Sequence, residues 1–268
     1  MAQGKRSTEK DIRRILGWIL TVVLALAGFL TPYAVRHPVP SQKKLADPNR
    51  AVARSVESSG STSFTWSPQD GVILKIPEYN GKPSITLHGS RPFFESSDFR
   101  KSSYKKFSSF DSLGRCGTAI AQIGPDLMPT EPRGKIGMVK PSGWHTVRYD
   151  DLIRDKYLYN RCHLIGYQLC GENANEENLI TGTRYLNVTG MEPYENEVAD
   201  YVKETGNAIL YRVTPVFLGD ELVARGVLME AESVKDRGRS LHFCVYCYNV
   251  QPGVAVDYAT GESARTQK

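Results

Sequence analysis

The sequence predicts an α+β domain that follows an N-terminal apolar segment and a polar tether. Strand-like segments lie on both sides of one helical segment, which is the order expected of this class rather than of alternating β and α units. The chain has 268 residues, of which 40% are hydrophobic, enough for a buried core. No period of roughly 20 to 50 residues indicates a repeat protein.

The N-terminal segment has the features of a membrane anchor. Residues 15–35 contain no charged side chain and are long enough to cross a bilayer as a helix, which needs roughly 20 residues. Residues 1–14 hold five Lys or Arg and are expected to stay in the cytoplasm. The anchor would then cross the membrane once, and the rest of the chain would lie outside the cell. Cleavage as a signal peptide, after the small residues Ala25-Leu26-Ala27, is the alternative and would give a secreted protein.

The positive net charge of +5 belongs to this segment. The first fifty residues hold nine Lys or Arg against three acids, which is +6, so the remainder carries about −1. Global basicity therefore gives no argument for a polyanionic partner, and any positive groove must be local.

Residues 36–70 are rich in Ser, Pro and charge and predict a flexible tether. The domain is expected over residues 71–258 and a disordered tail over 259–268. At its start, "VILKIPEY" and "PSITLHG" predict two short strands around the turn dipeptide Asn80-Gly81.

Further strands are predicted in three glycine-punctuated segments, "GRCGTAIAQIG", "IGMVKPSGWHTVRYD" and "YLYNRCHLIGY". Helical signals follow in "TRYLNV" and "PYENEVADYVKETG", where Pro193 suits the first turn and Gly206 the C-terminal cap. Three more strands are predicted in "AILYRVTPVFLG", "LVARGVLMEAESV" and "SLHFCVYCYNV". Together they predict a mixed antiparallel sheet.

The five cysteines are too few for a disulfide scaffold. Cys162 and Cys170 either form a local disulfide or remain free thiols. Cys244 and Cys247 lie in an alternating segment that places them on opposite faces of a strand, which favours ordinary strand cysteines over a metal or redox site.

The segment "YNRCH" holds the first candidate catalytic residues. In a strand, Arg161 and His163 share one face, so a cation for an anionic substrate points the same way as a general base. Downstream, Asn178, Asn187 and Glu195 offer the oxygen ligands that magnesium accepts. A neutral histidine facing bound magnesium is suited to phosphodiester hydrolysis. The chain has no G-x-x-x-x-G-K-[ST] loop, which argues against nucleotide-driven phosphoryl transfer.

These residues resemble the DNA/RNA non-specific endonucleases, whose ββα-metal site is marked by Asp-Arg-Gly-His and a later Asn metal ligand. Here the signature reads "NRCH" at residues 160–163, followed by "NLITGTRYLN". The resemblance extends over about residues 113–258. Within the family, the sequence resembles the secreted or membrane-anchored bacterial nucleases of the DNA-entry type. This resemblance implies a ββα-metal core, and Mg²⁺ as the cofactor with Mn²⁺ as a substitute.

By this resemblance, His163 is expected to be the general base and Asn187 the direct magnesium ligand. Glu195 is expected to hold metal-bound water, although Gly190 and Pro193 between it and Asn187 predict a kink or a second helix. Asn178 is expected to help shape the metal site as a further candidate ligand.

The resemblance also places Arg161 near the substrate phosphate and makes Arg133, in "PTEPRGKIG", the candidate arginine that assists the transition state. Two departures from the signature, Asn160 for Asp and Cys162 for Gly, lie on the strand face opposite His163. They are expected to alter support for the site without removing the base.

The expected function is therefore magnesium-dependent endonucleolytic cleavage of extracellular DNA, with RNA as a second candidate substrate and no protein partner. One alternative is a cell-surface module that binds nucleic acid without cutting it, which the Asn160 substitution leaves open. Another is a phosphodiesterase acting on cyclic nucleotides or lipids.

Overall fold

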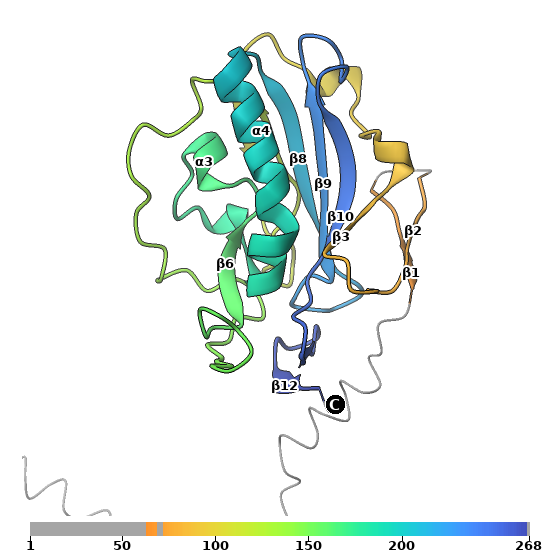
Figure 1. The fold of residues 1–268 in the computed structure, drawn as a ribbon, viewed down its shortest axis with the longest axis vertical. Helices are drawn as coiled ribbons and strands as arrows, with labels where there is room; N and C mark the ends of the chain where they lie inside the picture. Colours follow the sequence, from red (N-terminus) through yellow and green to blue (C-terminus); the bar gives the residue numbers. More distant parts are fainter. Residues whose placement is uncertain (1–62, 69–71, 267–268) are drawn as a thin grey trace, which may run out of the picture. The chain divides into compact units, whose positions relative to one another are not determined.

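A six-stranded antiparallel sheet forms the centre of the fold in the computed structural model, which describes residues 63–68 and 72–266. Its strand order is β3-β10-β9-β8-β5-β4 (Figure 1). The strands are β3 (Ser84–Thr86), β4 (Tyr104–Phe107), β5 (Ala119–Ile123), β8 (Ile209–Val216), β9 (Gly226–Ser233) and β10 (His242–Tyr248). The predicted strand segments that became β5, β8, β9 and β10 are confirmed.

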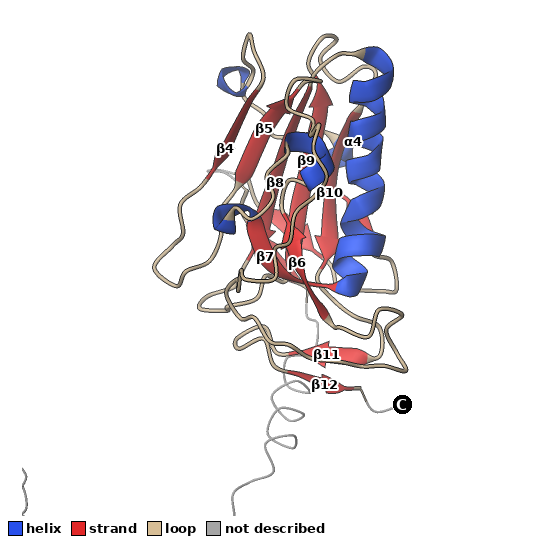
Figure 2. Ribbon diagram, turned by 90° about the vertical axis from the view of Figure 1, so that its left-hand side faces the viewer, coloured by secondary structure: helices blue, strands red, loops and turns tan. Residues whose placement is uncertain are grey.

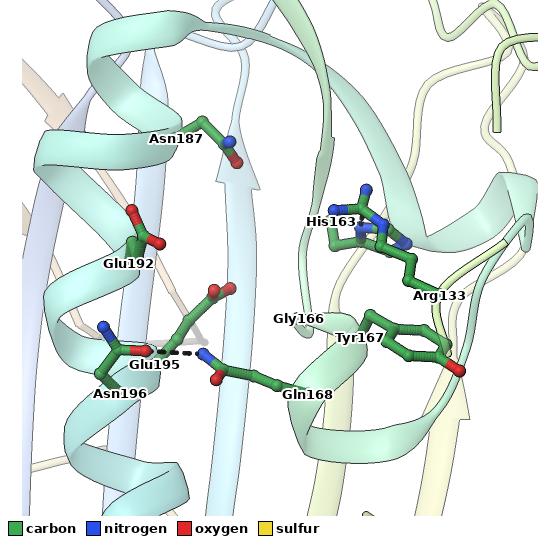
Figure 3. Close-up of a pocket in the computed structure, with 9 residues that line it drawn as sticks. All are labelled: Arg133, His163, Gly166, Tyr167, Gln168, Asn187, Glu192, Glu195 and Asn196. Atoms are coloured by element: carbon green, nitrogen blue, oxygen red, sulfur yellow. Dashed lines mark hydrogen bonds between the residues drawn. The ribbon is translucent and has the colours of Figure 1, made fainter. Parts of the chain in front are cut away.

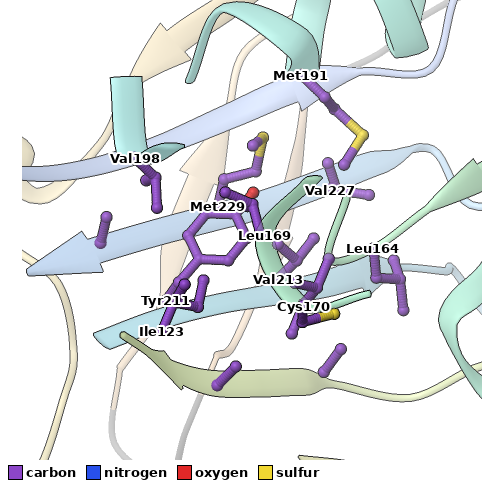
Figure 4. Packing of buried hydrophobic residues seen from close by; sticks show 14 of the residues in the cluster. Ile123, Leu164, Leu169, Cys170, Met191, Val198, Tyr211, Val213, Val227 and Met229 are labelled. Atoms are coloured by element: carbon purple, nitrogen blue, oxygen red, sulfur yellow. The ribbon is translucent and has the colours of Figure 1, made fainter. Parts of the chain in front are cut away.

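Helix α4 (Glu192–Thr205) covers one face of this sheet (Figures 1 and 2). As predicted, Pro193 lies in its first turn, and Gly206 ends it with φ of 67° while its N–H donates to the carbonyl of Val202. The helix buries Val198 and Ala199 against inward residues of the sheet such as Tyr211 and Met229 (Figure 4). The sheet and helix together confirm the α+β class.

A separate two-stranded antiparallel hairpin, β6 (Tyr159–His163) and β7 (Leu179–Thr183), precedes this helix in the chain. The predicted strand β6 is confirmed, whereas β7 is not among the strands that the sequence predicted. One π-helical segment, η4 (Leu186–Met191), then runs directly into α4. The smaller elements are β1 (Phe64–Trp66), β2 (Leu74–Ile76), η1 (His88–Ser90), η2 (Ser96–Asp98), α3 (Tyr167–Cys170), η3 (Glu176–Asn178), β11 (Val254–Val256) and β12 (Ser263–Arg265).

The N-terminal strands pair differently from the prediction. Strands β2 and β3 both form, but β2 pairs with β1 and β3 pairs with β10, so the Asn80-Gly81 turn connects two sheets rather than a hairpin. Strand β1 lies inside the range expected to be a tether. Its Phe64 ring packs edge-on against Tyr246, which explains why this aromatic stretch joins the fold.

Two further expectations need correction. The segment "IGMVKPSGWHTVRYD" forms no named strand and contributes only an isolated bridge, Arg148 to Tyr157, because Pro141 and the left-handed Gly143 interrupt extended pairing. The expected tail contains β12, which pairs with β11 and is tied to the domain by the Arg265 to Asp151 ion pair.

All five cysteines are free and buried, which answers the question left open for Cys162 and Cys170. Cys247 faces the core beneath α4, and Cys244 faces the other side of the sheet, as the strand alternation predicted. Residues 1–62, with the expected cytoplasmic segment, anchor and most of the tether, lie outside the described residues. Over residues 63–68 and 72–266, every helix is too short or too polar to span a bilayer.

Candidate active site

A pocket of about 250 Å³ lies between the end of β6 and the start of α4 (Figure 3). His163 and Arg133 lie on one side of it, and Asn187, Glu192 and Glu195 project from the helical side. The short helix α3 contributes the third wall. The pocket is also lined by Gly166, Tyr167, Gln168 and Asn196.

The imidazole of His163 is held in one tautomer. Its Nε2 lies 2.8 Å from the main-chain oxygen of Asn173, which can only accept, so Nε2 carries the proton. Its Nδ1 lies 3.4 Å from Nη2 of Arg133, which can only donate. The side chain is 6% exposed, and burial, reinforced by the positive charge of Arg133, lowers the pKa of His163 below its ordinary 6.5. His163 is therefore neutral at pH 7 with a lone pair on Nδ1, the state that a general base requires.

The amide of Asn187 is oriented from both sides. Its Nδ2 donates to Oδ1 of Asn160 at 3.2 Å, and its Oδ1 accepts from the thiol of Cys162 at 3.1 Å. Burial raises the pKa of Cys162 well above its ordinary value, so the thiol stays protonated as a donor. Asn160 and Cys162, expected on the face opposite His163, thus support Asn187 rather than the histidine.

The π-helical turn explains how Asn187 and Glu195 reach the same pocket. In a regular α-helix, side chains eight residues apart differ in direction by about 80°, whereas side chains seven residues apart differ by only about 20°. A π turn accommodates one extra residue, so the spacing from Asn187 to Glu195 acts as an i, i+7 pair. The expected kink or second helix at Pro193 is replaced by this continuous transition.

Glu195 lies against the backbone of Gly166, whose N–H donates to its carboxylate. A Cβ at position 166 would come within 2.8 Å of Oε2 of Glu195, so a larger residue there would displace the carboxylate. Burial, and then the negative charge of Glu192, raise the pKa of Glu195 to about 8. Two neighbouring carboxyl groups in such an environment are stabilised by a bound cation.

The oxygen donors of this wall fit a magnesium ion. Asn187 supplies an amide oxygen, and Glu192 and Glu195 supply carboxylates. The amide oxygen has a second lone pair beside its contact with Cys162. Among the described residues, no group of three His, Cys, Asp or Glu side chains is placed to hold a metal ion.

Two predicted site residues lie elsewhere. Asn178 is fully buried, and both of its amide atoms are bonded to the backbone of Ile165, at 2.9 Å each. It shapes the turn after His163, and its expected role as a metal ligand does not fit this geometry. Arg161 donates to the carbonyls of Val139 and Gly137 and lines a neighbouring pocket instead.

Other contributors were missed by the sequence analysis. The contact of His163 with the main-chain carbonyl of Asn173 could not be predicted, because every residue has a main-chain carbonyl. Gly166 and Glu192 were visible as residue types, yet their roles depend on α3 packing beside α4, a contact between distant segments.

Comparison with known proteins bears directly on this arrangement. Residues 97–235 match the family model of the DNA/RNA non-specific endonucleases. The fold is similar to NucA from Streptococcus agalactiae with a bound magnesium ion, at 23% identity and a TM-score of 0.59, over 80% of this chain and 95% of that one. It is also similar to the Sda1 nuclease with a bound zinc ion, at 28% identity and a TM-score of 0.53, over 61% of this chain and 82% of that one.

The matched region contains β6, β7 and the whole of α4, with every residue that lines the pocket. It covers more than half of the chain. The protein therefore belongs to the DNA/RNA non-specific endonuclease family and is an endonuclease.

Proposed function

We propose that this protein is a magnesium-dependent endonuclease that cleaves DNA, with RNA as a second substrate, using His163 as the general base. The observation that carries the proposal is the neutral tautomer of His163, whose Nδ1 faces the same pocket as Asn187 and Glu195. Contacts made chiefly to phosphate and sugar account for the expected lack of sequence preference.

In the proposed reaction, Nδ1 of His163 accepts a proton from the water that attacks the scissile phosphorus, and the bond from phosphorus to the leaving oxygen breaks. The Asn173 carbonyl holds the imidazole ring in place. Arg133 has no carboxylate partner among the ion pairs of the described residues, so its guanidinium is available to the phosphate oxygens. Asn187 would hold the metal directly, and Glu195 would orient water bound to it. When bound, magnesium supplies positive charge at the phosphate and the leaving oxygen.

Asn160 in place of the family's Asp is compatible with cleavage. Its side-chain oxygen accepts the hydrogen bond from Asn187, as a carboxylate oxygen would. The substitution therefore removes a charge but keeps the contact that orients the proposed ligand, which disfavours the alternative of a binding module without activity.

For localisation, we propose a single-pass anchor at residues 15–35 with the catalytic domain outside the cell, or a secreted enzyme if that segment is cleaved. Treatment of intact cells with a protease distinguishes these arrangements from a cytoplasmic one, because only an external domain is degraded or released.

The activity is tested by nicking of a supercoiled plasmid with magnesium, with manganese and with EDTA. We expect cleavage with either metal and none with EDTA. Equal cleavage in EDTA would contradict the metal requirement, and cyclic nucleotides or lipid phosphodiesters cleaved in preference to DNA would contradict the substrate class.

A further inference from the structure

A second pocket, of about 390 Å³, opens beside the catalytic pocket and shares Arg133 and Asn187 with it. It is therefore contiguous with the place where the scissile phosphate is proposed to bind. Of its lining residues, Arg161 is expected near the substrate phosphate from the family resemblance, whereas Trp144, Tyr157 and Arg184 have no role so far.

The charge of this second pocket differs from that of the first. Three arginines and no acidic residue line it, whereas Glu192 and Glu195 line the catalytic pocket. The acidic side chains thus line the catalytic pocket alone, whereas Arg133 and Asn187 line both pockets. A nucleic-acid backbone that runs from the catalytic pocket into the second pocket would therefore place its next phosphate among positive charges.

Arg161 is fixed in a position suited to such a phosphate. Its Nε and Nη2 donate to loop carbonyls, and its guanidinium stacks 4.0 Å over the ring of Trp144. Over residues 63–68 and 72–266 its charge has no carboxylate partner within ion-pair distance. A rigid, charged group with a free edge loses little entropy on binding an anion.

Arg184 is the second cation of the wall. It pairs with Asp155, but both side chains are substantially exposed, at 35% and 51%. An exposed ion pair of this kind is weak, so a phosphate can replace or share the carboxylate. Its Nη1 also lies 3.4 Å from Oδ1 of Asn160, which links this wall to the residue that orients Asn187.

Tyr157 supplies an aromatic surface at the rim. It is 47% exposed, and the guanidinium carbon of Arg148 lies 5.4 Å from the centroid of its ring. Each nucleobase has a flat face that stacks on such a ring without sequence preference.

We infer that the second pocket is a nucleotide subsite, in which Arg161 and Arg184 bind a phosphate adjacent to the scissile one and Tyr157 stacks on the attached base. The inference rests on the proposed function, since it takes the catalytic pocket to hold the scissile phosphate. It assigns substrate-binding roles to Tyr157 and Arg184, which lie outside the signature segment.

The test uses a single-stranded dodecathymidylate, whose bases are free to stack. Its KM and kcat are measured for wild type, Tyr157→Ala, Tyr157→Phe and Arg184→Gln, and its Kd is measured by fluorescence anisotropy in a His163→Ala background. Arg154→Gln is the control for the loss of an arginine, because Arg154 is exposed, lies in the loop that contains Tyr157 and lines neither pocket. Thermal melts verify that each variant is folded.

We expect Tyr157→Ala to raise KM and Kd about tenfold with kcat within about twofold, and Tyr157→Phe to bind like wild type. Arg184→Gln should lower the slope of log Kd against log salt by about 0.7, the value for one phosphate contact on a single strand, and Arg154→Gln should not. Wild-type binding by folded Tyr157→Ala and Arg184→Gln would overturn the subsite while leaving the proposed function intact. Failure of the wild type to cleave, with these binding changes present, would overturn the proposed function instead.

Discussion

The Nε2 atom of His163 lies 2.8 Å from the main-chain oxygen of Asn173. Because a carbonyl oxygen only accepts, this contact assigns the ring proton to Nε2 and leaves Nδ1 unprotonated on the side of Arg133. Backbone geometry therefore sets the tautomer of the proposed base, with the proton on Nε2 and the lone pair on Nδ1.

The first prediction concerns pH. Protonation of His163 removes the base, and its pKa is lowered, so kcat/KM should fall with decreasing pH only below about 6.5, the ordinary histidine value. Arg133→Gln removes the positive charge that contributes to this lowering, and its acidic limb should move to higher pH. The measurement is a pH-rate profile at saturating magnesium. A limb that stays in place in Arg133→Gln, or one that lies above 6.5 in wild type, would contradict the assignment.

The second prediction concerns Gly166. An alanine Cβ would lie 2.8 Å from Oε2 of Glu195 and displace the carboxylate, although φ of −55° suits alanine. We expect Gly166→Ala to lower kcat about tenfold and to raise the magnesium concentration for half-maximal activity. Gly137→Ala is the control, because nothing lies within 4 Å of its Cβ and its φ is not positive. Unchanged magnesium dependence in Gly166→Ala would show that Glu195 does not act at the metal.

The third prediction concerns the departure from the family signature at position 160. Asn160→Asp keeps the oxygen that accepts from Asn187 and should retain activity within about threefold. Asn160→Leu leaves the amide of Asn187 without that partner and should lose about tenfold or more, near the 1 to 3 kcal/mol of an unmade buried hydrogen bond. Steady-state kinetics on DNA compare the two. Equal activity of both variants would refute the orienting role.

The fourth prediction concerns the thiols. All five cysteines are free and buried, and burial raises the pKa of Cys116 and Cys244 to about 12, so both remain protonated and unreactive. Ellman's reagent should react slowly with the native domain and titrate five thiols after denaturation. The melting temperature and activity should be the same with and without dithiothreitol. A titration of three thiols would indicate the disulfide that the structure lacks.

The sequence predicted those elements whose signals are local. Helix α4 followed from Pro193 and Gly206, and β10 followed from the alternation of its own residues. His163 and Asn187 were found from their neighbours in a family signature, which places both at one pocket.

What the sequence missed depends on distant contacts. The π turn that aligns Asn187 with Glu195 has no residue signature of its own, because its register is set by packing. Asn178 was assigned to a metal because its side chain is a possible ligand, whereas the fold uses both amide atoms for the backbone of Ile165. The strands on both sides of the Asn80-Gly81 turn were predicted, but they do not pair with each other: β2 pairs with β1 and β3 pairs with β10.

The central claim is that His163 is the general base, and the most direct measurement compares DNA cleavage and DNA binding by His163→Ala and His242→Ala. His242 is an exposed histidine at the start of β10 that lines neither pocket. We predict that His163→Ala lowers kcat by about 10² to 10⁴ and keeps its Kd for DNA within about threefold, while His242→Ala matches wild type. A His163→Ala protein that is folded and cleaves DNA at the wild-type rate would contradict the account.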